Sequence, residues 1–349
     1  MKTFQLALLC CVIFLSACDN EPRARQAKFY AFGTEIDVSL YDVDEQTADN
    51  TIEVLEQSFS KVNDTWHAWQ PSTLTTINDA ISEGKAIAVT DDVTELINLA
   101  KILAIDSQHL FNPAAGKLFE LWGFHRDDWF ESHPPPSPQD IAHWLESSPT
   151  MEQVHITDGL LTSDNAMVKL GFGGFAKGFA VDTAIAALQQ QGITDAIINI
   201  GGDLRAIGSH GTRPWIIGIR HPRQEGMIAS IALGNDESVF TSGDYERFFE
   251  YEGTRYPHII DPRTGQPAKQ ASSVTVLHSN ASLADAAATA LFVAGDDWPN
   301  IAALMGIDYV MLVRPGGQIE MSPLMVERAQ LTNHLTPTII RPVEQTSAS

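Results

Sequence analysis

Two oxygen-bearing side chains lie four residues apart in an apolar segment towards the C-terminal end of the chain. Asp285 and Thr289 belong to the alanine-rich run 281–294, whose pattern predicts a buried helix. Side chains four residues apart share one helix face. A buried carboxylate requires a partner or a cation, and oxygen ligands suit Mg²⁺. The spacing indicates a magnesium site, and the alternative is a carboxylate that caps a neighbouring loop.

A glycine-rich segment forms the second candidate site. The sequence LGFGGFAKGFAVD at 170–182 holds several glycines and Lys177 before a helix predicted over 179–189. Glycine lets a ligand approach bare main chain, and N–H groups at a helix start attract phosphate. The motif is not a dinucleotide fingerprint, because no early βαβ unit leads to it. Phosphate binding is one interpretation, and a tight, closely packed turn is the other.

His258 is the candidate general base. It ends a predicted strand over 255–260 and lies three residues before Asp261. Histidine is the usual base near neutral pH, although a lone histidine can be structural. Two further polar segments, at 199–204 and 241–247, could face a ligand or could simply end strands.

The remaining patterns predict an α+β fold with mainly antiparallel sheets. Helical periodicity predicts helices at 47–63, 74–81, 91–107, 138–145, 179–189 and 281–294. Alternating or apolar runs predict strands at 29–41, 154–161, 166–170, 196–200, 215–220, 228–233, 238–241, 247–251, 255–260, 273–277, 309–314 and 318–321.

Composition excludes some classes of partner. The chain has 349 residues, 44% of them hydrophobic, and a net charge of −22. Such a composition is globular, whereas nucleic-acid binding is expected to leave a basic footprint. The negative charge also argues against electrostatic adhesion to anionic lipid.

The N-terminus predicts export. Lys2 precedes an apolar run at 4–14 that is too short to span a bilayer and fits a cleaved signal peptide. The following LSAC resembles a bacterial lipobox, which makes Cys18 the expected lipidation site; an ordinary secretory signal is the alternative. The expected division is a signal peptide at 1–17, a lipidated tether at 18–28, a domain at 29–325 and a polar tail at 326–349.

Five blocks in order resemble the ApbE family, the FAD:protein FMN transferases. The blocks are LFNPAAGKLFELWGF, LGFGGFAKGFAVD, NIGGDL, SGDYERFFEYEGTRYPHIIDPRTGQPA and ADAAATALFVAG. The resemblance implies two subdomains around a central FAD cleft, and Mg²⁺-dependent transfer of FMN to a Thr or Ser hydroxyl of a target redox protein, with release of AMP. It also implies a lipid anchor on the periplasmic side of the inner membrane, and Asp19 fits that location.

The resemblance assigns roles residue by residue. It implies that Asp285, Thr289 and a main-chain oxygen of Gly174 hold Mg²⁺. For catalysis, our hypothesis is that His258, aided by Asp261, takes the proton from the incoming hydroxyl. The implied FAD contacts are Phe32, Trp69, Phe111, Asn112, Gly171, Lys177 and Ile259. Two departures fall in this set: family members often have DLGG where this chain has GFGG at 171–174, and FDPT where it has FNPA at 111–114.

Two other functions fit the same residues. An FAD pyrophosphatase would use water in place of the protein hydroxyl and release FMN and AMP. A lipid-anchored flavin-binding protein would hold FAD without cleaving it.

Overall fold

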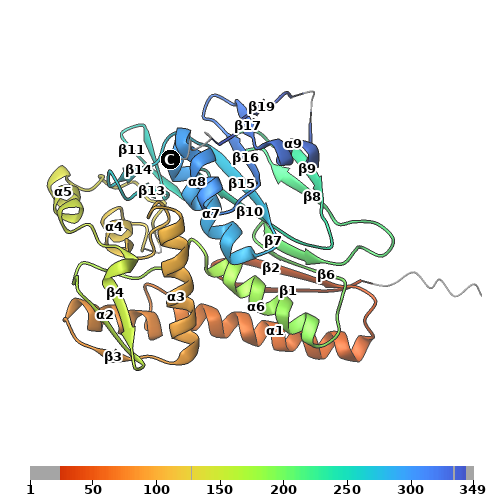
Figure 1. The fold of residues 1–349 in the computed structure, drawn as a ribbon, viewed down its shortest axis with the longest axis horizontal. Helices are drawn as coiled ribbons and strands as arrows, with labels where there is room; N and C mark the ends of the chain where they lie inside the picture. Colours follow the sequence, from red (N-terminus) through yellow and green to blue (C-terminus); the bar gives the residue numbers. More distant parts are fainter. Residues whose placement is uncertain (1–23, 127, 333–334, 343–349) are drawn as a thin grey trace, which may run out of the picture.

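One large antiparallel sheet organises the molecule (Figure 1). The computed structural model describes residues 24–126, 128–332 and 335–342. The strand order in the large sheet is β1-β2-β6-β7-β10-β15-β16-β17-β19. All neighbours are antiparallel except β17 and β19, which confirms the predicted fold class. The strands are β1 (Arg25–Ala31), β2 (Thr34–Leu40), β6 (Ala196–Ile200), β7 (Asp203–Ile207), β10 (Asp236–Gly243), β15 (Ser273–His278), β16 (Tyr309–Val313), β17 (Ile319–Met321) and β19 (Thr338–Ile339).

Helices cover one face of this sheet. Figure 1 shows α6 and α7 in front of the strands, α1 below β1 and β2, and α3 beside them. Strand residues such as Ile198 and Val276 share the largest apolar core with helix residues such as Leu55 and Leu291. The helices are α1 (Glu45–Trp66), α3 (Asp91–Asp106), α6 (Ala176–Gln190), α7 (Ala281–Ala294) and α8 (Trp298–Leu304).

A three-stranded sheet covers the opposite face. Its order is β18-β9-β8, and its strands span Ala329–Leu331, Met227–Ala232 and Ile216–Arg220. A second core lies between the two sheets and includes Leu277 and Met311 from the large sheet and Ile231 from β9. Because both faces of the large sheet are covered, β15 is buried along five of its six residues, including the polar residues Ser273 and Thr275.

Smaller elements gather at one end of the large sheet (Figure 1). Trp122, Phe124 and Phe249 form the centre of a third apolar core among them. The helices are α2 (Thr73–Ser82), α4 (Gly116–Leu121) and α5 (Pro138–Ser147), and short turns of 3-10 helix span Met151–Gln153 and Gly295–Asp297. The strands are β3 (Ile87–Ala88), β4 (Val154–Thr157), β5 (Leu160–Ser163), β11 (Phe248–Tyr251), β12 (Thr254–Pro257), β13 (Ile260–Asp261) and β14 (Gln266–Pro267).

Two strand predictions were wrong because a turn was missed. The strand expected over 29–41 is the β1–β2 hairpin, in which Phe32 and Gly33 have φ of 55° and 72°. The pair expected at 154–161 and 166–170 is instead the β4–β5 hairpin, which turns at Asp158 and Gly159. Asp-Gly is a strong hairpin signal because both residues tolerate positive φ.

The predicted ends of the domain also change. Helix α9 (Pro323–Arg328) leads into β18, which pairs with β9, so the polar tail expected over 326–349 contributes to the fold. Strand β1 begins at Arg25, within the tether expected over 18–28. The predicted signal peptide and Cys18 lie outside the described residues. Within the described ranges, no helix has both the length and the apolar character to cross a membrane.

Candidate functional site

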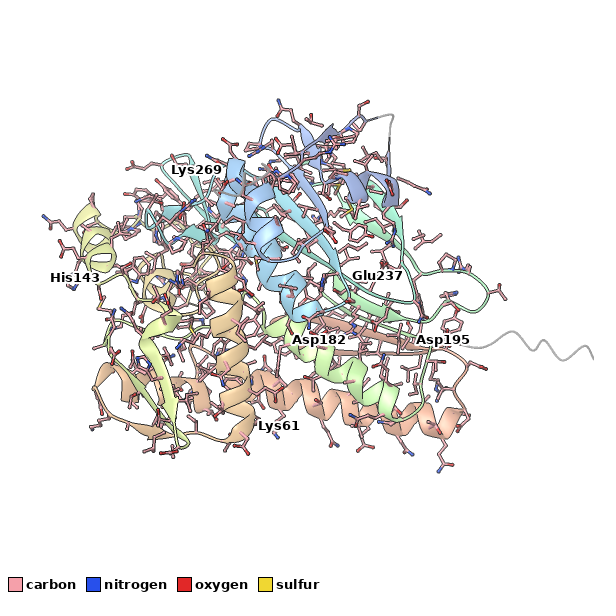
Figure 2. All side chains as sticks on the ribbon, in the orientation of Figure 1. Lys61, His143, Asp182, Asp195, Glu237 and Lys269 are labelled. Carbon is pink, nitrogen blue, oxygen red and sulfur yellow. The ribbon has the colours of Figure 1, made fainter. Side chains whose placement is uncertain are left out.

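Helix α7 carries the two predicted metal ligands, and both of its ends are fixed by local signals. The Asn280 side chain accepts a hydrogen bond from the Leu283 N–H at 2.7 Å. Asp182, labelled in Figure 2, accepts from the N–H groups of Ala281 and Ser282 at 2.9 and 2.8 Å. Gly295 ends the helix with φ of 61°. Twelve of its fourteen residues are buried, and small alanines let neighbouring elements pack closely around it.

Helices α6 and α7 approach each other closely at Gly178. A Cβ atom at this position would lie 2.3 Å from the carbonyl oxygen of Ala281, so only glycine fits. The Gly178 N–H donates a 3.0 Å hydrogen bond to Oδ2 of Asp285, which is 6% exposed. The end of the glycine-rich segment is thereby joined to the predicted metal carboxylate.

A second approach joins the same segment to Thr289. A Cβ atom at Gly174 would lie 3.7 Å from Oγ1 of Thr289 and 3.1 Å from the ring of Phe111. The Thr289 hydroxyl also lies 3.1 Å from the Ser242 hydroxyl of β10. A Cβ atom at Gly173 would meet no atom within 4 Å, so open space borders the loop there. The two predicted clusters therefore form one site.

Lys177 forms an ion pair with Asp203, at the start of β7. The other carboxylate oxygen of Asp203 accepts from the Thr241 N–H at 2.8 Å. Burial opposes the charge on Lys177, but the carboxylates of Asp203, Asp285 and Glu246 outweigh it and hold its pKa above the usual value. Lys177 is therefore a fixed positive charge beside the glycine-rich loop.

Carboxylates crowd this site. Burial raises the pKa of Asp285 well above its usual value; Lys177 opposes the shift, and Asp203 adds to it. Glu246 keeps contact with solvent, yet the protein atoms around its carboxyl group raise its pKa to about 7. Three carboxyl groups close to Lys177, those of Asp203, Glu246 and Asp285, favour a bound cation.

His258 lies in the same electrostatic environment. Its Nδ1 is 3.1 Å from the carbonyl oxygen of Arg247. Since a carbonyl only accepts, Nδ1 must donate, which leaves Nε2 as the proton acceptor in the neutral ring. Burial and the nearby charges of Arg247 and Lys177 lower the pKa of His258 to about 4. The ring is therefore a neutral base at pH 7.

Asp261 does not assist His258 in this structure. Its carboxylate binds the Arg263 guanidinium, with an Oδ2–Nη2 distance of 2.8 Å, and it also accepts from the Arg263 backbone N–H. Arg263 in turn donates to the carbonyl of Val293 in α7. Asp261 fixes the turn after β13 against α7, and no hydrogen bond joins it to His258 among the described residues.

Three of the implied flavin contacts lie close to the glycine-rich loop. Phe111 is buried and packs edge-on against Phe175, with ring centres 5.7 Å apart. The Asn112 amide is used locally, since it accepts from the Ala114 N–H and donates to the Pro149 carbonyl. Gly171 borders open space, and its N–H donates to the Pro113 carbonyl.

The other implied contacts lie further around the site. Phe32 occupies the β1–β2 turn and donates its N–H to Asn63, while Ile259 is buried beside His258. Trp69 stacks on Phe119 at 5.9 Å, with the Lys169 ammonium 4.8 Å from its ring centre. Ring contacts continue from Phe119 through Phe124 to His258, so Trp69 is connected to the site at a distance. A groove of about 470 Å³ lies beside Trp69.

The donor set fits Mg²⁺ better than a transition metal. Asp285, Thr289 and the Gly174 backbone offer oxygen atoms on elements that touch each other. In the part of the chain that the structure describes, no three His, Cys, Asp or Glu side chains group together as a metal site. Mg²⁺ commonly takes one or two carboxylates and completes its shell with water and substrate phosphate.

Asp203 and Ser242 were not predicted as site residues. Both lie in segments whose polar character was visible in the sequence, NIGGDL and TSGDYER. Strands β7 and β10 are neighbours in the sheet, and this pairing brings the two segments to one edge of the site. The pairing depends on contacts between residues distant in sequence, so the local patterns could not reveal it.

Comparison with known proteins identifies similar chains. The ApbE family profile matches residues 32–311. The chain is 40% identical over 320 residues to an FAD:protein FMN transferase of Rhodobacter capsulatus, covering 90% of this chain and 60% of that protein. It is 32% identical over 272 residues to one of Klebsiella pneumoniae, covering 75% of this chain and 80% of the relative.

A solved structure shares the fold. The crystal structure of the ApbE protein from Thermotoga maritima superposes with a TM-score of 0.80 at 31% identity, covering 88% of this chain and 100% of that one. The profile match covers most of the chain, and both the sequence and the fold agree with members of the family. The chain therefore belongs to the ApbE family.

Proposed function

We propose that this chain transfers FMN from FAD to a Thr or Ser hydroxyl of a target redox protein and releases AMP. Relatives named FAD:protein FMN transferase support the reaction class. The observation that carries the proposal is the junction of Asp285 and Thr289 with the glycine-rich loop at Gly178 and Gly174. This junction gathers oxygen ligands, loop N–H groups and a lysine where a diphosphate could lie.

The proposed step is a displacement at the FMN phosphorus. The hydroxyl oxygen of the target forms a P–O bond, and the bond from the same phosphorus to the bridging oxygen of the diphosphate breaks. AMP leaves with that oxygen, and the hydroxyl proton passes to a base. Such reactions depend mainly on positioning and on stabilising charge at phosphate oxygens.

The residues of this chain divide that work. Asp285, Thr289 and the Gly174 backbone would hold Mg²⁺, which when bound neutralises charge on the diphosphate. Lys177, whose charge is maintained by Asp203, adds a positive charge beside the loop. His258 presents Nε2 as the proton acceptor, because its Nδ1 is committed to the Arg247 carbonyl.

The test is transfer of fluorescent flavin to protein. The chain is incubated with FAD, Mg²⁺ and a flavin-free subunit of a sodium-pumping quinone reductase, and the denatured gel is read for flavin fluorescence. We expect a fluorescent subunit band and equimolar AMP. FMN and AMP with no labelled band would indicate a pyrophosphatase, and intact bound FAD would indicate a binding protein.

We also propose that the chain is anchored by lipid on Cys18 at the periplasmic side of the inner membrane. The support is the apolar run at 4–14 followed by LSAC, with Asp19 next in the chain. Growth with labelled palmitate should label the parent chain and leave Cys18→Ser unlabelled. Equal labelling of both chains would contradict the anchor.

A further inference from the structure

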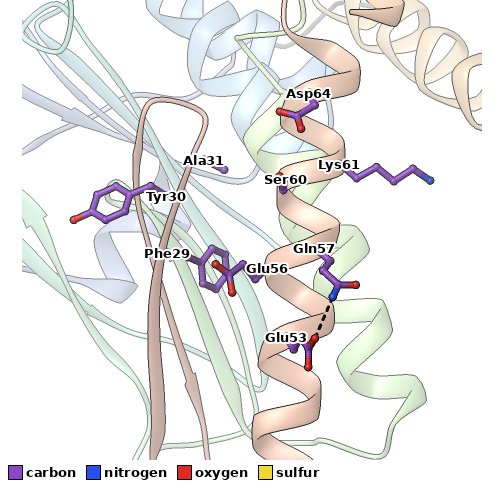
Figure 3. Close-up of a pocket in the computed structure, with 9 residues that line it drawn as sticks. All are labelled: Phe29, Tyr30, Ala31, Glu53, Glu56, Gln57, Ser60, Lys61 and Asp64. Atoms are coloured by element: carbon purple, nitrogen blue, oxygen red, sulfur yellow. Dashed lines mark hydrogen bonds between the residues drawn. The ribbon is translucent and has the colours of Figure 1, made fainter.

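The outer edge of the large sheet borders a groove that the proposed reaction does not use. Strand β1 is the first strand of the sheet, with β2 as its only neighbour in the described residues. A groove of about 600 Å³ runs between β1 and α1. Figure 3 shows its lining, which comprises Phe29, Tyr30 and Ala31 of β1 and Glu53, Glu56, Gln57, Ser60, Lys61 and Asp64 of α1.

The register leaves hydrogen-bonding groups of β1 directed away from β2. The two-residue turn at Phe32 and Gly33 makes Ala31 and Thr34 a hydrogen-bonded pair, and such pairs alternate along an antiparallel ladder. The N–H and C=O groups of Lys28 and Tyr30 therefore point to the open edge. No other backbone hydrogen bond occupies them among the residues that the structure describes.

The wall opposite this edge is one stripe of α1. Glu53 and Asp64, the ends of the stripe, are eleven residues apart, or about 16 Å along the helix. That length matches about five residues of extended chain. A groove between an edge strand and a helix is the form in which a peptide adds to a sheet as an extra strand.

Charge and position identify the kind of peptide. The α1 wall carries Glu53, Glu56 and Asp64 against the single cation Lys61, so it complements a basic segment. One end of β1 leads to the site: a Cβ atom at Gly33 would lie 3.6 Å from the guanidinium of Arg247, whose carbonyl holds His258. A strand laid along β1 therefore runs towards the proposed base.

We propose that the groove between β1 and α1 binds an extended, basic segment of the flavin-acceptor protein, which adds to β1 as a further strand. This inference rests on the proposed function. It explains how a small site could select one hydroxyl, because backbone pairing fixes the direction and register of the bound segment. Acidic segments would be repelled by the carboxylates of α1, and folded segments could not pair with β1.

A backbone variant separates pairing from side-chain contact. Tyr30→Pro removes the outward N–H and keeps the β1–β2 ladder, since that N–H faces away from β2. Tyr30→Ala removes the same exposed side chain and keeps the N–H. With the quinone reductase subunit as acceptor, we expect Tyr30→Pro to raise KM at least about tenfold, at unchanged FAD affinity, and Tyr30→Ala to stay close to the parent.

A charge variant tests the α1 wall. Glu53→Lys combined with Glu56→Lys should raise KM for the subunit, whereas Glu95→Lys, on the exposed surface of α3, should leave it unchanged. Hydrogen exchange of the parent chain should slow at Lys28 and Tyr30 when the subunit is added.

The outcomes distinguish failure of the groove proposal from failure of the proposed function. Parental KM values in Tyr30→Pro and in the double charge variant would overturn the groove proposal while transfer itself persists. Protection of β1 that rises with the concentration of this chain alone would indicate a second copy in the groove and would also overturn it. No transfer by the parent chain would instead contradict the proposed function.

Discussion

The chemistry of His258 is set by the groups around it. Its Nδ1 donates to the Arg247 carbonyl, and burial with two nearby cations lowers its pKa to about 4. The neutral ring is the form that can accept a proton, and here it predominates at every pH above about 4. An unperturbed histidine would lose this capacity below about pH 6.5.

The first prediction concerns the pH dependence of transfer. The single-turnover rate should hold from pH 8 down to about pH 5, because His258 remains neutral over that range. His258→Gln should lower the rate by about 10²-fold or more at pH 7. Stopped-flow release of AMP measures both. A rate that halves near pH 6.5 would contradict the assigned environment.

Glu246 requires a control in that experiment. Its pKa of about 7 means that it changes charge within the measured range. Repeating the profile in Glu246→Gln removes this second titration.

Residue types in the sequence were enough to identify part of this site. Asp285 and Thr289 were visible from helical spacing, and His258 from its place at a strand end. Asp203 was not, because its partner Lys177 lies 26 residues away and the two meet only when β7 packs against α6. The expected pairing of His258 with Asp261 was not found, because the closer Arg263 takes the carboxylate.

At the scale of elements, the crossing of α6 and α7 positions the site. Gly178 both permits the close approach and supplies the N–H that binds Asp285. Asp182, one turn further along α6, binds the first N–H groups of α7 and the Arg205 guanidinium. These contacts fix the two helices to each other beside the glycine-rich loop.

The second prediction follows from that crossing. Gly178→Ala places a methyl group against the Ala281 carbonyl, which should destabilise the protein by about 1–3 kcal/mol and separate Asp285 from the loop. Thermal melts should show the lower stability, and transfer assays should show a lower rate of FMN transfer. For the melt, Gly173→Ala is the matched control, because its methyl group meets open space. Equal melting temperatures for the two variants would disprove the close contact.

Local signals determined which elements could be predicted. The bounds of α7 match the prediction 281–294, since Asn280 and Gly295 mark its ends in the sequence. The β1–β2 hairpin was missed because Phe32 adopts a positive φ, which its residue type does not suggest. Strand β19 could not be predicted from two exposed residues whose pairing with β17 is the only evidence of a strand.

At the scale of the whole molecule, the large sheet is stable because both of its faces are covered. The helices cover one face, and β18-β9-β8 covers the other with the help of the C-terminal segment. The sequence could not assign this segment a place, because β18 pairs with a strand about one hundred residues earlier.

The third prediction tests that arrangement. A chain ending at Arg328 lacks β18 and β19. The loss of β18 leaves β9 with β8 as its remaining partner and removes the Leu331 side chain, which packs against the second core. Its melting temperature should fall by several degrees relative to a chain ending at Pro342, which controls for shortening. Identical melting curves would show that β18 adds nothing to stability.

The most direct test of the account is the Mg²⁺ dependence of FMN transfer in Asp285→Asn. The asparagine oxygen can still accept from Gly178, so the crossing of α6 and α7 is retained while the charge is lost. We expect the transfer rate of the parent and of the surface control Asp106→Asn to rise with Mg²⁺ and to saturate. In Asp285→Asn the transfer rate should fall by about 10²-fold or more. A folded Asp285→Asn chain with the parental rate and Mg²⁺ response would contradict the site.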